Sequence, residues 1–358
     1  MLRARALDIL PHVTDLAGAS VDCLVVLNEA QTVPVAVPVF VDEIEALPDR
    51  SLDIIGRTEA HIDPVYLTKL HDVVLLGDRH VVTQDGVHLV DLWNQAGLHT
   101  TAPTATAPGG DVHFVSQTCL LLFHNASSGD NHSHWLLQTL PQLGLCARLG
   151  IRPDLLLVQP NIRPYQRDVL AALGYGPECL LVRDPRQAMR FRCLFVGYVD
   201  GGLVPDPYVF DRQIAAFDRG QPGPEKLYVS RQDARGIRRL LNEGDLIGRL
   251  RGQGFTIVEP STLSAAEEVS LFRNARLIVG PLGAGLYNAL FTRPGAMIVA
   301  LSDPRYVMDW LPQAAALRGH AHAWCFGLGF EAYDSVYAGT HGNWIVDVER
   351  VGSIVARL

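Results

Sequence analysis

The chain has 358 residues, which is long for a single hydrophobic core and predicts two domains. Hydrophobic residues make up 48% and charged residues 19%, with a mean hydropathy of +0.14, so the composition is that of a folded globular protein and not of a disordered chain. The net charge of −8 and the pI near 5.9 exclude nucleic acid as the main partner, because that partner requires a broad basic surface.

Cellular location is indicated by the apolar segments and by the first residues of the chain. No run of 18 apolar residues occurs, and the first 18 residues, MLRARALDILPHVTDLAG, contain Arg and Asp where a signal peptide needs a continuous apolar core. We therefore expect a cytoplasmic protein. Six scattered cysteines, none in a Cys-x-x-Cys pair, are expected to be buried free thiols. They are Cys23, Cys119, Cys146, Cys179, Cys193 and Cys325.

The first half of the chain mixes short strands with loops. The expected strands are short runs rich in β-branched residues, at 22–30, 71–82 and 118–125. Residues 100–111, TTAPTATAPGGD, carry few large apolar side chains and predict a surface loop. Helical spacing follows over 134–150, with a kink or break at Pro141, and then strand, helix and strand alternate up to residue 197. That alternation is typical of α/β proteins.

A Gly- and Pro-rich segment, DRGQPGPE at 218–225, is the best candidate for a linker. Beyond it the alternation is regular, and short connections between alternating elements predict a parallel, doubly wound sheet of the nucleotide-binding type. The expected strands are 226–230, 255–260, 276–280 and 296–301, and the expected helices are 236–254, 264–275 and one from about Gly285.

The loop after the strand at 276–280 is the first candidate site. Ligands of open parallel sheets bind at the carboxyl ends of strands, and Gly283 and Gly285 would let a diphosphate approach the main chain and the amino end of the next helix. The alternative is that these glycines only make a tight turn, because GPLGAG differs from the dinucleotide fingerprint G-x-G-x-x-G.

Arginines follow the strand at 226–230. Ser230 and Arg231 stand at its carboxyl end, where a guanidinium can grip phosphate oxygens in bidentate fashion and stabilise a departing diphosphate. Arg231 is the strongest single candidate. For Arg235, Arg238 and Arg239 a solvated face of an amphipathic helix is the favoured interpretation.

Two further segments contain candidate residues. His132 and His134 in NHSHWLLQTLP can each act as a general base near neutral pH, a structural hydrogen-bonded histidine is an equal alternative, and a metal site ranks below both. Glu267 lies three residues after Ser264, which favours a capping box, although its carboxylate could accept hydrogen bonds from a sugar or ribose hydroxyl. No Asp-x-Asp pair, the short metal anchor of many sugar transferases, occurs in the chain.

Three segments, in this order, resemble the family-61 glycosyltransferases: NHSHWLLQTLP, KLYVSRQDARGIRRLLNE, and the stretch from STLSAAEEVS through GPLGAGLYNALF to AMIVAL. The family includes bacterial capsular polysaccharide biosynthesis proteins, plant xylan xylosyl- and arabinosyltransferases, and extracellular O-linked N-acetylglucosaminyltransferases. The resemblance covers about residues 120–301, and the ordered combination is much more specific than any one motif.

The resemblance implies a GT-B-like α/β fold, with two Rossmann-like lobes, a cleft between them, and inversion at the anomeric carbon without a metal. We therefore predict an N-terminal acceptor-side lobe at 1–217, a linker at 218–225 and a nucleotide-sugar-binding lobe at 226–340. The C-terminal tail at 341–358 is expected to pack back on the N-terminal lobe. The motif positions implied as donor-binding are Ser230, Arg231, Arg239, Asn242, Glu267, Pro281, Leu282, Gly283, Ala284, Gly285 and Asn288.

The sequence departs from the family pattern at three positions. The family commonly has Asp where Gln138 stands, His where Leu282 stands, and an acidic residue where Ala300 stands. These departures point either to an unusual donor or to weakened or lost activity.

The resulting hypothesis is an inverting glycosyltransferase that uses no cofactor and moves a sugar from a nucleoside diphosphate, expected to be UDP, to a hydroxyl of a bacterial surface glycan or related, including lipid-linked, acceptor. His134, or with less support His132 or Asp130, takes the acceptor proton. The main alternative is an inactive nucleotide-sugar- or glycan-binding subunit of a polysaccharide assembly system. An NAD-dependent oxidoreductase is disfavoured because the fingerprint G-x-G-x-x-G is missing.

Overall fold

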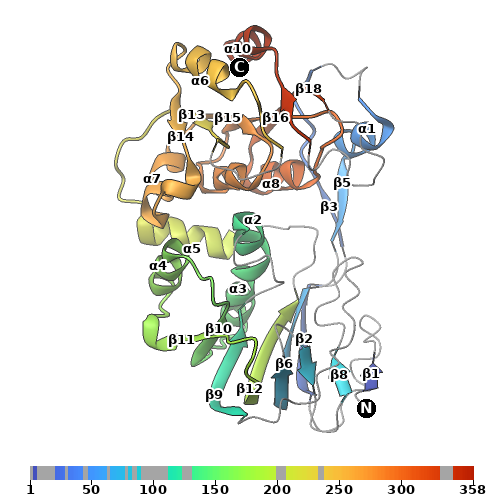
Figure 1. Cartoon of the computed structure of the whole chain (residues 1–358), viewed down its shortest axis with the longest axis vertical. Helices are drawn as coiled ribbons and strands as arrows, with labels where there is room; N and C mark the ends of the chain where they lie inside the picture. Colours follow the sequence, from blue (N-terminus) through green and yellow to red (C-terminus); the bar gives the residue numbers. More distant parts are fainter. Residues whose placement is uncertain are drawn as a thin grey trace. The chain divides into compact units, whose positions relative to one another are not determined.

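The computed structural model groups the chain into two compact units, the first formed by residues 1–31 and 61–209 and the second by residues 32–60 and 210–358 (Figure 1). Both contain helices and β-sheet, so the predicted α/β class is confirmed. The residues that the structure describes are 3–5, 21–28, 31–42, 47–62, 65–76, 80–82, 87–89, 112–122, 131–198, 207–232, 238–330 and 342–358.

The first unit is built on a mixed sheet with the order β1-β8-β7-β6-β12-β9-β10-β11, with β2 also paired to β6. β9, β10, β11 and β12 run parallel where they pair, whereas β6 is antiparallel to β2, β7 and β12. Its strands are β1 Arg3–Arg5, β2 Val21–Asn28, β6 Val65–Leu76, β7 His80–Val82, β8 Val87–Leu89, β9 His113–Leu121, β10 Leu155–Val158, β11 Leu180–Val182 and β12 Met189–Tyr198.

Helical segments of the first unit lie between β9 and β12 in the chain. They are α2 His132–His134, the π-helix η3 Trp135–Thr139, α3 Pro141–Arg148, α4 Pro164–Ala172 and the 3-10 helix η4 Pro177–Cys179. Side chains of the four central strands, among them Leu70, Leu121, Leu157 and Leu194, form a fully buried cluster. The predicted loop at 100–111 falls outside the described residues.

The second unit contains a six-stranded sheet with the order β14-β13-β15-β16-β17-β4, and every pair in it is parallel. The predicted strands at 226–230, 255–260, 276–280 and 296–301 are all present. The strands are β4 Phe40–Val41, β13 Lys226–Val229, β14 Thr256–Val258, β15 Leu277–Pro281, β16 Met297–Ser302 and β17 Ala321–Phe326. A separate pair, β18 Leu328–Gly329 and β19 Trp344–Ile345, is antiparallel.

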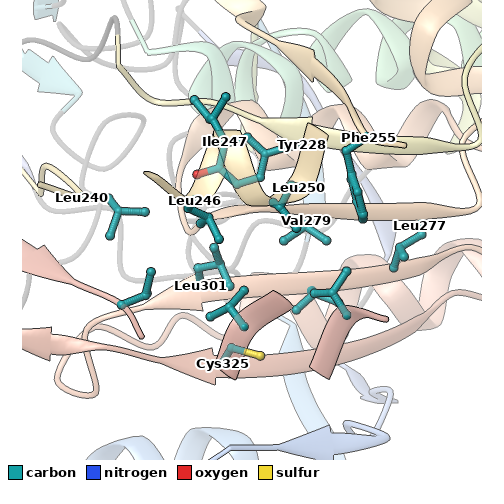
Figure 2. Packing of buried hydrophobic residues seen from close by; sticks show 14 of the residues in the cluster. Tyr228, Leu240, Leu246, Ile247, Leu250, Phe255, Leu277, Val279, Leu301 and Cys325 are labelled. Carbon is teal, nitrogen blue, oxygen red and sulfur yellow. The ribbon is translucent and has the colours of Figure 1, made fainter. Parts of the chain in front are cut away.

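Helices connect the strands of this sheet and pack against it. Figure 2 shows Tyr228, Val279, Leu301 and Cys325, from four adjacent strands, in one buried cluster with apolar side chains of α6, such as Leu246. The helices of the unit are α1 Asp49–Ile55, α5 Pro207–Phe217, α6 Glu243–Arg251, the 3-10 helix η5 Pro260–Thr262, α7 Ala265–Arg273, the 3-10 helix η6 Ala284–Phe291, α8 Trp310–Arg318 and α10 Val348–Val355.

Two segments belong to the second unit, although no local sequence pattern indicated this. Residues 32–60 contribute β4, which pairs with β17, whereas the predicted N-terminal lobe ran from 1 to 217. The tail at 341–358, expected against the N-terminal lobe, packs instead in the second unit, where Gln253, just after α6, donates to the carbonyl of Gly352 at 2.9 Å. An ion pair of 2.5 Å between the partly exposed Arg350 and the buried Asp42 links both segments. β3 Gln31–Pro34 and β5 Glu59–Ile62 form a two-stranded sheet where the chain passes from one unit to the other and back.

Two helices differ from the sequence prediction. The helix expected over 236–254 begins only at Glu243, because Leu240 pairs with Trp344 and Leu241 donates to the Trp344 carbonyl at 2.8 Å. This pairing satisfies main-chain groups that a helix would otherwise use. The helix expected from Gly285 is a 3-10 helix, Ala284–Phe291.

Two buried histidines predict how stability depends on pH. Burial lowers the pKa of His320 and of His322 from 6.5 to about 4. The folded state therefore resists protonation, so stability is fully present above pH 6.5 and falls as the pH drops from 6.5 to about 4, by up to about 3 kcal/mol for each histidine. Urea-unfolding midpoints of the whole chain at a series of pH values measure this loss.

His322→Leu provides the matched variant, because both His322 ring nitrogens are buried without a hydrogen-bond partner among the described residues. Leucine at this position should keep the unfolding midpoint at pH 7.5 and make the acid-side decline shallower. A decline as steep as in the wild type would show that His322 does not contribute to it.

Candidate functional site

The strand order of the second unit marks one position in its sheet for ligand binding. From β13 the chain goes to β14 on one side and then returns through β15, β16 and β17 on the other side. In open parallel sheets, ligands bind at the carboxyl ends of the two strands where this reversal occurs. Here these are the ends of β13 and β15, which lead into Ser230–Arg231 and Leu282–Gly283.

Arg231 and Gly283 lie in contact at this position. A Cβ atom placed on Gly283 would overlap Nη1 of Arg231 and would lie 2.9 Å from its Cζ, so the guanidinium lies against the Gly283 main chain. Gly283 has a φ of 169°, an extended conformation open to any residue, so the space taken by Arg231 is what requires glycine here. The structure thus brings together the two residues that the sequence singled out most strongly.

The main chain at Arg231 is held by a buried carboxylate. Glu243, the first residue of α6, accepts hydrogen bonds on Oε1 from the Arg231 N–H at 2.9 Å and from the Tyr228 hydroxyl at 3.1 Å. Burial, followed by the charge of Glu243, raises the pKa of Tyr228, so its hydroxyl remains a donor. The Ser230 hydroxyl is buried and accepts from the N–H of Gln232 at 3.2 Å. These contacts hold the main chain of Ser230, Arg231 and Gln232 at the end of β13.

The loop after β15 packs tightly against β13. A Cβ on Gly280 would lie 2.7 Å from the Val229 carbonyl oxygen, and one on Gly285 would lie 3.0 Å from both Val229 Cγ1 and Pro260 Cγ. Leu282 is buried, and its N–H donates to the Leu301 carbonyl at 2.7 Å. Small residues thus allow the start of η6, at Ala284, to lie beside the end of β13.

Replacing Gly283 with alanine tests whether this contact matters. The added methyl group must displace the Arg231 guanidinium. If the nucleoside diphosphate expected from the sequence binds here, its affinity should fall about tenfold or more, because a charged hydrogen bond contributes roughly 1.5–3 kcal/mol. Titration calorimetry with UDP measures the change. Gly248→Ala is the control, because a Cβ at Gly248 on α6 meets no atom within 4 Å. Equal UDP affinity for Gly283→Ala and wild type would contradict an Arg231-dependent site.

Arg238 is a residue that the sequence interpretation missed. It was expected on a solvated helix face, but it has a φ of 55°, lies outside α6, and places its Cζ 4.5 Å from the centre of the Tyr306 ring. Its Nε is buried and has no hydrogen-bond partner among the described residues. Tyr306 is 68 positions away in the chain, so no local pattern could have revealed the contact.

A narrow pocket lies at the carboxyl ends of β15 and β16, next to the candidate site. Besides Pro281 and Leu282 it is lined by Arg238, Leu301, Ser302, Asp303, Tyr306 and Trp344. It has room for roughly one water molecule. Leu282, where the resemblance leads one to expect histidine, therefore contributes an apolar wall to this pocket and no hydrogen-bonding side chain.

Other predicted donor-binding residues have clear structural contacts. The Asn242 side chain forms hydrogen bonds to both main-chain groups of Val346, at 2.7 and 3.1 Å. The main-chain N–H of Arg239 donates to the Asn343 side chain at 3.1 Å. Both residues therefore fix the segment around β19 beside the start of α6, and a donor-binding role for them stays a prediction.

Glu267 and Asn288 also have internal partners. The Glu267 carboxylate accepts from the N–H and hydroxyl of Ser264 at 2.8 and 2.7 Å, the capping box that the spacing favoured, and these bonds lower its pKa. Asn288 is fully buried on η6 and donates to Glu268 at 3.2 Å. These contacts explain both motif positions as parts of the fold.

The candidate histidines of the first unit lie at the start of a helix interrupted by a π-turn. Asn131 caps this helix, because its side-chain oxygen accepts from the Ser133 N–H at 3.1 Å. The π-helix η3 ends just before Pro141, which lacks an N–H and whose ring would crowd an ordinary α-turn. The interruption predicted at Pro141 is thus a π-turn followed by a new helix.

His132 and His134 have different partners. His132 Nδ1 lies 3.2 Å from the Tyr165 hydroxyl. Nδ1 of His134 is hydrogen-bonded to Oε1 of the buried Gln138. Asp130, the third candidate for the base, lies outside the described residues.

The described ranges also bear on metal binding and on membrane spans. They contain no group of three His, Cys, Asp or Glu side chains arranged to hold a metal ion. No helix within them is long and apolar enough to cross a bilayer.

Comparison with known proteins identifies one family. A family model described as Glycosyltransferase 61 matches residues 132–299, from α2 in the first unit to β16 in the second. The match includes Arg231, Gly283, His132 and His134, and it confirms the resemblance seen in the sequence motifs. No curated protein matches the chain.

Proposed function

Because residues 132–299 belong to the glycosyltransferase 61 family, we propose that the chain is an inverting, metal-independent glycosyltransferase of GT-B architecture. It moves a sugar from a nucleoside diphosphate, UDP in the first instance, to a hydroxyl of a bacterial surface glycan or related acceptor, including a lipid-linked one. The described cysteines are free thiols, in keeping with a reaction in the cytoplasm.

The observation that supports donor binding is the contact of Arg231 with Gly283 at the strand-order reversal. A guanidinium can bind two phosphate oxygens at once, and the first N–H groups of η6, at Ala284 and Gly285, begin a helix whose amino end favours an anion. A diphosphate carries enough negative charge to engage both features. In this proposal Arg231 supplies the positive charge that a divalent ion supplies in other sugar transferases.

In the proposed reaction one bond forms as another breaks. The acceptor hydroxyl oxygen bonds to the anomeric carbon, and the bond from that carbon to the donor phosphate oxygen breaks, leaving its electron pair on the nucleoside diphosphate. His134 takes the proton of the acceptor hydroxyl. Arg231 stabilises the negative charge that develops on the departing phosphate. Displacement in one step inverts the anomeric configuration.

Incubation of the whole chain with a panel of UDP-, GDP- and dTDP-sugars and simple glycoside acceptors tests the proposal. The expected result is release of one nucleoside diphosphate together with a glycoside of inverted anomeric configuration, identified by proton NMR coupling constants. Transfer with retention would refute the mechanism. Tight nucleotide-sugar binding with neither transfer nor hydrolysis would favour an inactive binding subunit, the alternative suggested by the departures at Gln138, Leu282 and Ala300.

A further inference from the structure

We propose that Gln138 is a positioning residue that fixes His134 as the tautomer with hydrogen on Nδ1, which leaves Nε2 as the atom that takes the acceptor proton. The inference rests on the proposed function for the role of that proton. The contact itself is seen in the structure, where Oε1 of Gln138 is the hydrogen-bond partner of His134 Nδ1.

Gln138 is well placed to hold an imidazole. It lies in the middle of the π-helix η3, its side chain is 2% exposed, and its main-chain oxygen accepts from Gln142 Nε2 at 3.3 Å. His134 precedes this π-helix directly and is half-buried. Residues four apart on a helix lie on the same face, so both partners belong to one continuous helical segment.

The chemistry of the two side chains determines the tautomer. An amide oxygen can only accept a hydrogen bond, and a neutral imidazole has one N–H group. With Oε1 against Nδ1, the hydrogen must be on Nδ1, and the lone pair on Nε2 remains available. After proton transfer the imidazolium has hydrogen on both nitrogens, and its Nδ1–H still donates to Gln138.

The opposite orientation of the Gln138 amide would have the opposite effect. Its NH₂ group would then face Nδ1, the hydrogen would be on Nε2, and that nitrogen could not take a proton. The two orientations of the Gln138 amide therefore give two different tautomers of His134, and one measurement can tell these tautomers apart.

The measurement is the pair of ring ¹⁵N chemical shifts of His134 in the whole chain at pH 8, assigned by their loss in His134→Gln. We expect a protonated Nδ1 and an unprotonated Nε2 in the wild type. Gln138→Met keeps the side-chain length but removes the acceptor, so the shifts should move toward the Nε2–H form. In that variant kcat should fall about tenfold to a hundredfold with the donor KM unchanged, because general-base catalysis contributes roughly a hundredfold or more.

Two further variants separate positioning from folding. Gln138→Glu retains an acceptor oxygen, so it should restore the Nδ1–H form and most of kcat. Tyr165→Phe removes the hydroxyl beside His132 and leaves the Gln138 contact intact, so the His134 shifts should not change.

Wild-type protein that transfers sugar with hydrogen on Nε2 of His134 would overturn the inference and leave the transferase proposal standing. Unchanged His134 shifts in Gln138→Met would overturn it as well. Hydrogen on Nδ1 in a wild type that transfers no sugar from any donor would refute the proposed function, and with it the catalytic role of Nε2.

Discussion

Arg231→Ala is expected to lower kcat/KM for sugar transfer at least about a hundredfold while the chain stays folded. Removing a preorganised group that stabilises charge in a transition state costs about 2.7–4 kcal/mol. The fold should persist, because Glu243 binds the Arg231 main-chain N–H and this contact survives the substitution. Initial rates with a fixed acceptor and varied donor, together with thermal unfolding, measure both effects.

Two other substitutions provide the comparisons for this result. Arg231→Lys keeps the positive charge but loses the planar guanidinium. Its kcat/KM should therefore lie between the values of the wild type and of Arg231→Ala. Arg276→Ala removes an exposed guanidinium next to the amino end of β15, paired with Glu225 at 3.7 Å, and should leave kcat/KM near the wild-type value. An Arg231→Ala variant with more than half of the wild-type rate would exclude the phosphate role of Arg231.

His134→Ala is expected to lower kcat about a hundredfold or more and to leave UDP affinity unchanged. A positioned general base contributes about 10²–10⁴ in rate, and the proposed donor contacts are made by residues of the second unit. Pre-steady-state transfer rates and UDP titration calorimetry separate the two quantities. If His132→Ala shows the larger loss and His134→Ala retains near-normal kcat, His132 and not His134 is the base.

The sheet of the second unit could be predicted from sequence because its strands are short apolar runs. Each run is bounded by polar or turn residues, and the helices between them are long enough to show their own periodicity, as in the Ser264–Glu267 capping box. Short connections between alternating elements predicted parallel strands with Arg231 and Gly283 at strand ends, whereas the order of the strands came only from the structure. Local sequence pattern was sufficient for these elements, because each depends mainly on residues that are close together in the chain.

Contacts between distant segments account for what could not be predicted. Residue 42 pairs with residue 350, and β4 joins the edge of a sheet whose other strands begin at Lys226, so chain order misassigned this segment. Arg238 and Arg239 fit a helical pattern with the residues after them, but pairing with the strand at Trp344 takes up the main chain there. Helix propensity is overridden where hydrogen bonds to a distant segment take up the same main-chain groups.

Contacts within the candidate site were also beyond what the sequence could predict. The sequence indicated that Gly283 lies near a ligand, whereas its direct neighbour is the Arg231 guanidinium. Gln138 stood out in the sequence only as a departure from a family pattern, and its contact with the His134 imidazole could be seen only in the structure. Side-chain contacts of this kind depend on distances that no spacing in the chain specifies.

Hydrogen–deuterium exchange of the whole chain with and without UDP tests donor binding at this site most directly. The expected result is slower exchange in peptides that cover 227–232 and 281–288, with no comparable change around β10 and β11 of the first unit. UDP binding that slows exchange elsewhere, and leaves the peptides at Arg231 and Gly283 unaffected, would contradict a donor seated at the ends of β13 and β15.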